Sequence, residues 1–523
     1  MSVSEDPAVE SASSSYDRVP YTSWPYANSH PNRLATIGHL LGVPTPPLDR
    51  MRVLELGCAS GGNLIPMAEM FSGGTFLGVD ASSRQIGQGR DRIQSLGLDN
   101  IELLNVQLQD LEKTDPPFDY IITHGVYSWV PPNVQESILR ISRDWLSPHG
   151  VAYISYNTNP GWKMRGMIRD MLGYHCESFD DPSARVHQAR ALLQFLTGAA
   201  DSQTAYGAFL KEESELFARV TDDYLFHDHL EGHNEALYFH EFVRRARDAG
   251  LSYLGEPYLF LMATRNFPDD VEQTLQRVAT DTIDVEQYMD FLRNRSFRMT
   301  LLVRSDQPVD RTIEPKRLKG LYVCASLTRV TEDRFELPTL FDCGERRIEA
   351  LDPATSECFA VLAERWPHHL QFESLVEQVE QRLQTWPHIA WQPPDDLADY
   401  IGEHLIHCAV GNLVHLHAHG PKFVTEITEK PMVSQWPRLQ ACDGERVTNQ
   451  KHEIVSLDDP ARWLLSRLDG TKTIEELAAE LTERVEAGEF EWENAEPGDH
   501  SQEAVRAYLR QFRDGALLQP EPA

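Results

Sequence analysis

Short apolar runs alternate with longer amphipathic segments through the first third of the chain. The apolar runs lie at 52–56, 75–79, 101–105, 120–123 and 151–156, and the amphipathic segments lie at 63–71, 83–95 and 134–145. A short apolar run bounded by turn residues is typical of a buried strand, whereas apolar residues recurring every three or four positions indicate a helix. Strands that alternate with helices at this spacing predict a parallel sheet covered by helices on both faces.

The alternation is interrupted after residue 157 and resumes further along. A long helical stretch runs to about residue 220, and a second helical insertion covers roughly 268–297. Apolar runs at 251–255 and 297–304 follow these insertions. We predict that both runs join the N-terminal sheet as its last two strands.

Outside this sheet, the pattern predicts three further parts. Residues 1–50 form a polar tail and a cap segment, in which an aromatic and proline-rich stretch leads into a helix that begins at Ser29 and ends before Gly42. The sheet and its insertions occupy 51–305. A helix-rich module follows at 306–425, and a last module occupies 426–523. A chain of 523 residues is too long for one hydrophobic core, which agrees with several domains.

The composition narrows the choice of partner and compartment. The chain has 48 Lys+Arg and 80 Asp+Glu, a net charge of −32. Such a charge repels phosphate backbones, so we expect no nucleic acid as a partner. It favours a cationic partner such as a lysine-bearing protein. Alternatively, the negative charge only keeps the protein soluble. The N-terminus lacks the apolar region of a signal peptide, and no apolar run reaches the length of a membrane span, so the expected location is cytoplasmic.

The segment VLELGCASGGN (53–63) carries the clearest chemistry. An apolar strand ends at Glu55 and is followed by a turn containing Gly57 and Gly61. Glycines let the backbone turn sharply and approach a ligand closely, and the helix that follows directs free N–H groups toward it. Asp80 ends the next strand, where an acid is placed to accept hydrogen bonds from ribose hydroxyls.

This glycine pattern alone also fits a dinucleotide site or a turn that binds nothing. Gly57, Ala59 and Gly62 nearly match the GxGxxG motif of oxidoreductases. The segments FDYII (118–122) and LSPHG (146–150) add an acid-led fourth strand and the approach to a fifth. In this combination, residues 51–157 resemble the class I S-adenosylmethionine-dependent methyltransferases.

That resemblance implies a Rossmann-like α/β sheet with helical insertions, followed by smaller α-rich C-terminal domains. It also implies S-adenosylmethionine as cofactor and no metal. Ala59 stands where the family usually has glycine, and Gln107 stands where an acid is commoner. The cofactor-binding residues it implies are Glu55, Gly57, Ala59 and Gly61 at the turn, Asp80 at the ribose, Gln107 and Leu108 beside the adenine, and His124 and Gly125 near the amino-acid end.

Segments outside the core resemble the rickettsial-type protein lysine methyltransferases. They are the cap segment 16–42, THGVYSWVP (123–131), SYNTNPGW (155–162), the "methyltransferase regulatory domain" at 222–304, and the segment 452–478. The resemblance implies methylation of lysine side chains in a protein. A small-molecule methyltransferase and a non-catalytic cofactor-binding regulator are the alternatives.

A lysine nucleophile requires a site that removes water from the amine, because its free pKa is about 10.4. Aromatic walls exclude water from the amine and also tolerate its protonated, cationic form. We therefore expect the segment 16–30, with its aromatic residues, to close over the cofactor. The substrate-site candidates are Tyr26, His30, Tyr127 and Trp129, and the further aromatic wall candidates are Tyr21, Trp24, Tyr156 and Trp162.

Two groups of residues rich in histidine and one group of arginines are interpreted as structural and not as functional sites. The group His227, His229, His233, Glu235 and His240 matches no compact zinc spacing. His415, His417 and His419 alternate as they would on one strand face, which could bind a transition metal; the favoured interpretation is an exposed strand edge. Arg293, Arg295 and Arg298 are expected to form internal ion pairs with Asp290 or to contact the sheet.

Overall fold

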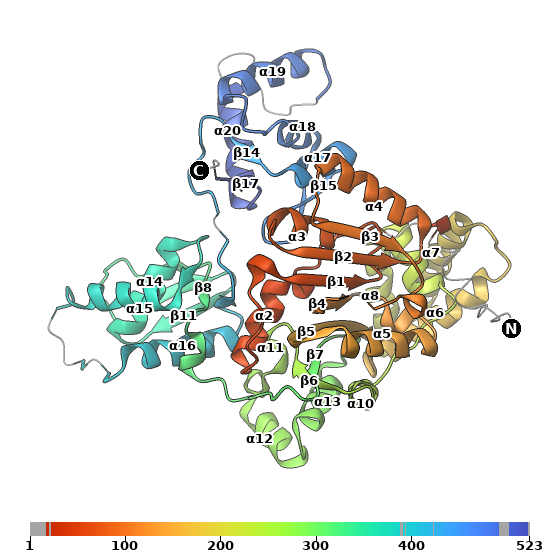
Figure 1. Cartoon of the computed structure of the whole chain (residues 1–523), viewed down its shortest axis with the longest axis horizontal. Helices are drawn as coiled ribbons and strands as arrows, with labels where there is room; N and C mark the ends of the chain where they lie inside the picture. Colours follow the sequence, from red (N-terminus) through yellow and green to blue (C-terminus); the bar gives the residue numbers. More distant parts are fainter. Residues whose placement is uncertain are drawn as a thin grey trace.

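The computed structural model describes residues 17–19, 22–113, 115–387, 391–392, 394–421, 423–490 and 501–520. Its centre is a seven-stranded sheet with the strand order β3-β2-β1-β4-β5-β7-β6 (Figure 1). The strands are β1 (Arg52–Leu56), β2 (Thr75–Asp80), β3 (Ile101–Asn105), β4 (Phe118–Thr123), β5 (Leu146–Asn157), β6 (Leu251–Gly255) and β7 (Phe297–Arg304).

The first five strands run parallel, and β7 is antiparallel to both β5 and β6. The prediction that 251–255 and 297–304 extend the N-terminal sheet is therefore confirmed. The regulatory region supplies these last two strands of the sheet, so it is an integral part of the sheet and not a separate sheet of its own. The Rossmann-like fold class is confirmed as well.

Helices bury both faces of the sheet, because side chains alternate along each strand. Val53 belongs to the core on one face and Leu54 to the core on the other. The first face is covered by α2 (Pro31–Leu40), α3 (Leu64–Met70) and α4 (Ser83–Leu96), and the second by α5 (Pro132–Asp144) and α10 (Phe239–Asp248).

Helix α2 begins one residue later than the sequence predicts. The N-cap is His30, whose Nδ1 accepts a hydrogen bond from the Asn32 backbone N–H at 3.1 Å. Ser29, the expected cap, is buried, and its hydroxyl donates to the Tyr26 carbonyl oxygen at 2.9 Å. An imidazole nitrogen can replace the usual capping oxygen, because the N-cap requires only an acceptor.

The helical insertions form their own layer beside the sheet. The first contains α6 (Gly161–Cys176), α7 (Pro182–Ala199), α8 (Ala205–Arg219), α9 (Asp222–Leu225) and the π-helical turn η5 (Phe226–Leu230), which share one apolar cluster. The short α11 (Leu259–Met262) precedes the second, which contains α12 (Asp269–Val278) and α13 (Thr282–Arg293).

A second core lies in the region expected to be helix-rich. It contains α14 (Pro353–Arg365), α15 (Phe372–Leu383) and α16 (Leu397–Val410), but also two three-stranded sheets. Four of their six strands have only two or three residues, which is too short to show a period. The strands are β8 (Tyr322–Cys324), β12 (Leu370–Gln371) and β13 (His415–His417) in one, and β9 (Thr328–Arg329), β10 (Thr339–Cys343) and β11 (Arg346–Ala350) in the other.

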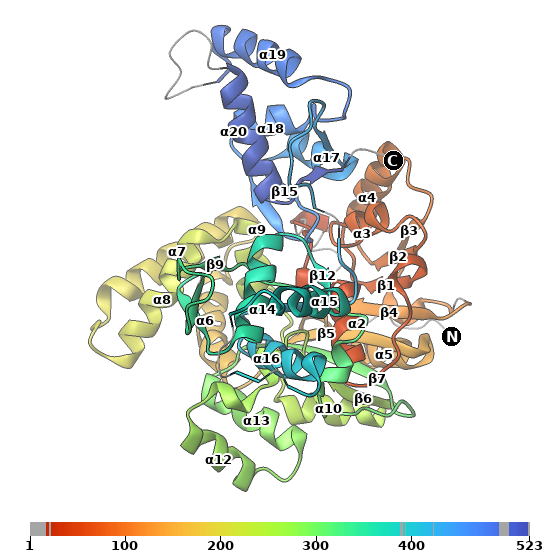
Figure 2. The ribbon, with the colours of Figure 1, turned by 90° about the vertical axis from the view of Figure 1, so that its left-hand side faces the viewer.

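The C-terminal module has a third core of its own. It combines α17 (Gln435–Asp443), α18 (Asp459–Leu465), α19 (Ile474–Glu486) and α20 (Ser501–Asp514) with the strand pairs β15 (Arg446–Thr448) with β16 (Ile454–Ser456) and β14 (Met432–Val433) with β17 (Leu518–Gln519). Figures 1 and 2 show it and the middle module as two separate lobes on the sheet domain, with α2 between the middle lobe and the sheet. No helix among the described residues is long and apolar enough to cross a membrane.

The arginines before β7 pair as expected in two cases of three. Arg298 Nη1 lies 2.8 Å from Glu256 Oε1, and Arg295 Nη2 lies 2.8 Å from Glu256 Oε2. Arg298 also binds Asp290 at 2.8 Å. Arg293 differs, because its guanidinium donates to the Leu261 carbonyl oxygen at 2.6 Å.

Candidate functional site

A cavity of about 420 Å³ lies where the carboxyl ends of β1, β2 and β4 meet. Ligands of open α/β sheets bind at this edge, and the volume falls within the roughly 300–1,000 Å³ of small-molecule sites. Eight of the nine expected cofactor residues line it, together with residues from four other segments. Those eight are Glu55, Gly57, Ala59, Asp80, Gln107, Leu108, His124 and Gly125.

The turn after β1 has the backbone shape that brings it close to a ligand. Gly57 has φ +79°, and a Cβ at this position would lie 2.4 Å from Cγ2 of Val126. Ala59 adopts φ +50°, so this alanine takes the left-handed conformation that glycine adopts without strain. Gly61, the ninth cofactor residue, lies outside the cavity lining and closes the turn through a 2.9 Å bond from its N–H to the Cys58 carbonyl.

Asp80 connects the turns that follow β1 and β2. One carboxylate oxygen accepts from the Ala59 N–H at 2.9 Å, and the other accepts from the Ser82 N–H at 2.8 Å. A carboxylate has about four acceptor positions, so two remain for a pair of hydroxyls. Burial raises the pKa of Asp80, and the two N–H donors oppose that shift.

We expect Asp80→Ala to weaken S-adenosylmethionine binding by about 1–3 kcal/mol, or roughly 5- to 150-fold in Kd. The loss combines missing hydrogen bonds to the ligand with a loosened Ala59 turn. Isothermal titration calorimetry measures the effect, with Asp91→Ala, an exposed acid on α4, as the matched control. An Asp80→Ala affinity equal to that of the control would contradict the assignment.

Glu55 is a buried carboxylate with one acceptor atom still open. Its Oε1 accepts from Asn63 Nδ2 at 2.7 Å, whereas Oε2 has no hydrogen-bond partner among the described residues. Burial raises the pKa of Glu55 to about 7. A ligand ammonium or an ordered water at Oε2 would complete its hydrogen bonding.

Asn63 joins three distant parts of the chain beneath the glycine turn. Its Oδ1 accepts from the Tyr26 N–H at 2.9 Å and lies 2.8 Å from Nε2 of His452, while its Nδ2 donates to Glu55. His452 belongs to the loop between β15 and β16 of the C-terminal module. Burial lowers its pKa well below the usual value, so the ring is neutral and Nε2–H is the donor. The C-terminal module thus reaches the floor of the cavity.

We expect His452→Leu to weaken S-adenosylmethionine binding by about 0.5–1.5 kcal/mol, roughly 2- to 12-fold, because one hydrogen bond to Asn63 is lost. His452→Gln, which retains an N–H donor, is the matched variant and should recover part of the affinity. The same calorimetric titration applies. Equal affinities for the wild-type and leucine proteins would show that this contact does not position the site.

The end of β4 supplies a second polar arm of the cavity. His124 stacks on Tyr26 with ring centroids 3.7 Å apart, and its Nδ1 lies 2.9 Å from the Tyr153 hydroxyl. Gly125 has φ +66°, and its N–H donates to Ser155 Oγ at 2.8 Å. These contacts fix the backbone where β4 ends, beside the N-terminal segment.

The other end of the cavity has aromatic walls. Trp129 and Trp162 contact edge to face, with ring centroids 6.1 Å apart. Tyr26 and Phe297 complete this wall, and all four side chains line the cavity. Indole Nε1 of Trp162 is buried without a partner among the described residues. This end can remove water from an alkyl amine while it attracts the corresponding cation.

Other aromatic candidates pack elsewhere. Tyr127 is buried against Phe242 with ring centroids 5.2 Å apart, and Tyr156 stacks on the same ring at 4.0 Å. His30 packs against His452 below the turn, with ring centroids 5.0 Å apart. None of these three residues lines the cavity. The sequence could not predict this, because spacing along the chain does not reveal on which side of a strand end a ring lies. Trp24 lines a neighbouring cavity with Trp436, and Tyr16 and Tyr21 lie outside the described residues.

The turn η5 contributes residues that the sequence did not assign to the site. Tyr224 at its approach, with His227 and Asp228 within it, lines the cavity beside the tryptophans. Burial raises the pKa of Asp228, and its hydrogen bond with Tyr224 opposes the shift. π-helical turns are rare and frequent at functional sites. The dense run of acids and histidines at 222–229 was the sequence signal for these site residues. The sequence analysis weighed its histidines only as possible metal ligands.

The described residues of the N-terminal segment lie beside the cavity, at 17–19 and from 22 onward. Ser23 Oγ accepts from the Gly62 N–H at 2.8 Å, and the Val19 carbonyl oxygen lies 2.7 Å from His227 Nε2. Thr22 binds Asp223 through both its N–H and its hydroxyl. Ser23 and Tyr26 line the cavity. This placement agrees with a lid that joins the glycine turn to η5.

Comparisons with known protein families match three regions of the chain. A model described as "Methyltransferase domain" matches residues 54–152, and one described as "Predicted methyltransferase regulatory domain" matches 221–304. A model described as "PKMT, C-terminal winged helix domain" matches 429–519. The matches cover the cavity turn, the region containing η5, and the module containing His452.

Two relatives match nearly the whole length of this chain. Uncharacterized protein RP789 of Rickettsia prowazekii is 34% identical over 491 residues, covering 91% of this chain and 87% of that protein. Two solved structures of PKMT2 from Rickettsia typhi are 30% and 31% identical, with TM-scores of 0.84. Each is covered over 100% of its length by 95% of this chain, and one of them is in complex with AdoHcy.

Proposed function

Because this chain belongs to the methyltransferase family that includes PKMT2 of Rickettsia typhi, we propose that it transfers methyl groups to lysine side chains of a protein. PKMT denotes protein lysine methyltransferase. The chain is an S-adenosylmethionine-dependent methyltransferase. The observation that carries the finer proposal is one cavity that joins the cofactor turns to an aromatic end, which carries the acid Asp228 and the neighbouring cation Arg165.

The residues at the strand ends fit the cofactor. Gly57 has the positive φ that the turn requires, Asp80 keeps acceptor positions for ribose hydroxyls, and Glu55 Oε2 is open to an ammonium. When bound, the cofactor supplies a methyl group on a positively charged sulfur, and the protein holds the acceptor in line with it.

The aromatic end fits a lysine side chain. The amine must lose its proton before it can attack, although its pKa in water is about 10.4. Removal of water between Trp129 and Trp162 lowers that pKa, and the carboxylate of Asp228 can accept a hydrogen bond from the ammonium as it arrives. Asp228 would therefore bind and orient the amine and take up its proton.

We expect Asp228→Asn to reduce kcat/KM for protein methylation by about 10²-fold or more, the lower end of general-base effects. Cofactor affinity should be unchanged. In the wild type, activity should rise with pH as Asp228 loses its proton, and burial moves that rise above the usual aspartate range. The variant should lack this rise.

The matched control for this substitution is Asp222→Asn, whose side chain is 72% exposed on the preceding helix. Rates are measured from label transfer at several pH values. An Asp228→Asn enzyme with the pH profile and rate of the control would remove Asp228 from the reaction.

The substrate class is tested by incubating the purified chain with methyl-labelled S-adenosylmethionine and a cell extract. Label in the protein fraction, including automethylation, supports the proposal. Label only in the small-molecule fraction would favour a small-molecule methyltransferase. Cofactor binding without label transfer would favour a non-catalytic regulator. A reaction without the chain is the negative control in each arm.

A further inference from the structure

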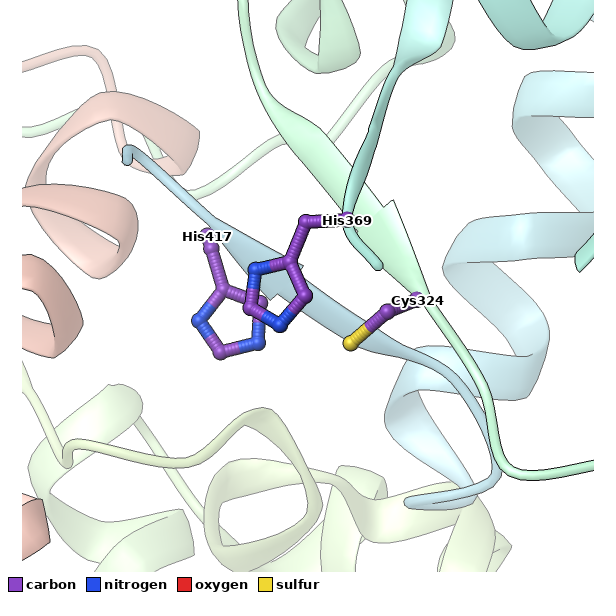
Figure 3. A group of neighbouring side chains, drawn as sticks. All are labelled: Cys324, His369 and His417. Carbon is purple, nitrogen blue, oxygen red and sulfur yellow. The ribbon is translucent and has the colours of Figure 1, made fainter. Parts of the chain in front are cut away.

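The middle module brings a cysteine and two histidines together far from the methyltransferase cavity. Figure 3 shows Cys324, His369 and His417 on neighbouring strands with their donor atoms facing the same space. One ligand atom from each residue lies within 4.8 Å of the other two. Cys324 ends β8, His417 ends β13, and His369 directly precedes β12.

The register of this small sheet explains the cluster. His415 pairs with Cys324 and His417 with Tyr322 on one side of β8, and Leu370 pairs with Val323 on the other. Since side chains alternate between faces, positions 324, 369, 415 and 417 lie on one face. The expected strand edge is confirmed, because β13 is the outer strand of this sheet, but His415 and His417 are half-buried and of the three histidines only His419 is exposed.

The chemistry of the set is that of a transition-metal site. The two imidazoles stack with centroids 4.3 Å apart and planes 25° apart, and Nδ1 of His369 is buried without a hydrogen-bond partner among the described residues. A thiol and neutral imidazoles are ligands that zinc prefers, whereas calcium and magnesium require oxygen.

We propose that Cys324, His369 and His417 bind one Zn²⁺ ion in a tetrahedral site whose fourth position is taken by water or by His415. Zinc–nitrogen and zinc–sulfur bonds of about 2.0–2.3 Å place tetrahedral donors about 3.5 Å apart. The donors therefore have to approach by about 1 Å, within the range of side-chain rotation. Binding releases the thiol proton to solvent and forms the Zn–S bond.

Two cations limit the strength of the site. They are Lys451 and Arg33, which act electrostatically on Cys324. Both cations have aromatic partners, because Arg33 lies over the Tyr258 ring at 4.8 Å and Lys451 over the Trp366 ring at 4.9 Å. The thiolate reduces the net charge of a bound zinc to +1, which lessens its repulsion by these neighbours.

The position of the cluster suggests what the ion does. The segment after β13 is tied to α2, because His419 exchanges two hydrogen bonds with Asn32 and the Ala418 N–H donates to Thr36 Oγ1 at 2.8 Å. Lys451 is next to His452, which contacts the cavity floor. Zinc would therefore hold three strands of the middle module at the place where α2 and the C-terminal loop meet it.

The test uses the full chain, stripped with a chelator, dialysed and titrated with ZnCl₂. We expect one zinc per chain by mass spectrometry of the metal and a rise of several degrees in Tm. Cys324→Ser and His417→Gln should each lose at least nine-tenths of the bound zinc. The matched controls are Cys408→Ser, a buried cysteine of the same core, and His368→Gln, the neighbour of His369, and both should retain it.

Cobalt gives an independent readout of the ligands. Co²⁺ in the wild-type chain should show the intense visible bands of a tetrahedral ion and a sulfur-to-metal charge-transfer band, and Cys324→Ser should lack the latter. Circular dichroism confirms that each variant is folded. Zinc that remains bound in Cys324→Ser, or a wild-type chain that binds no zinc after dialysis, would overturn the proposal and leave the cluster as packed side chains.

Discussion

Replacement of Arg298 by methionine is expected to lower the local stability of the sheet by about 3–5 kcal/mol, the effect of removing one partner from a buried ion pair. Arg298 is 0% exposed and lies between Glu256 and Asp290, with each contact at 2.8 Å. It also lies over the Phe239 ring at 3.8 Å. Methionine fills a similar volume but leaves buried acids without their strongest partner. The strand β7 would lose its side-chain ion pairs with Glu256, which follows β6, and with Asp290 of α13.

Because the chain has several cores, the loss is measured best by amide hydrogen exchange in β6 and β7, which reports the opening of that region alone. Arg304→Met is the matched control: it ends the same strand, and its ion pair with Asp306 is exposed. Its effect should stay within about 1 kcal/mol. Similar exchange rates in both variants would show that the buried cluster contributes little.

Deletion of residues 1–26 is expected to reduce methyl transfer by about 100-fold or more while the sheet stays folded. The segment supplies Ser23 and Tyr26 to the cavity lining and holds the glycine turn through the Gly62 N–H. Its loss admits water and misplaces the reacting groups, and misplacement by about 1 Å costs about 10²-fold. The deletion ends at 26 because Ser29 and His30 are buried and support α2.

Deletion of residues 1–15, the acidic serine-rich tail, is the matched control and should leave the rate unchanged. Label transfer to protein and the thermal unfolding of both truncated chains are compared. Near-normal turnover after removal of 1–26 would show that this segment is not a lid. Its aromatic residues would then only pack the N-terminus against the outside of the sheet.

The strands and the glycine turn could be predicted because they depend on local pattern. A buried strand ending in Glu55 and a turn requiring positive φ at Gly57 have sequence signatures a few residues long. The place of β7 followed from the resumed apolar pattern after an insertion. These features set the sheet edge, and with it the position of the cofactor residues.

The rest depends on contacts between distant segments. Asp228 reaches the cavity because a helical insertion folds back over the sheet, and His452 reaches Asn63 from 389 residues away. Aromatic content alone did not separate Trp129, which lines the cavity, from Tyr127, which packs against Phe242. The metal-ligand geometry at Cys324 emerges only once three short strands pair.

The central claim is that the enzyme transfers a methyl group from S-adenosylmethionine bound in the cavity to a lysine side chain of a protein. The most direct measurement is tandem mass spectrometry of proteins incubated with the chain and trideuteromethyl S-adenosylmethionine, with a reaction that lacks the chain as the blank. We predict peptides with trideuteromethyl groups on lysine Nε in the wild-type reaction and none in the blank. Labelled proteins whose deuterated methyl groups lie on other side chains, or a wild-type reaction indistinguishable from the blank, would contradict it.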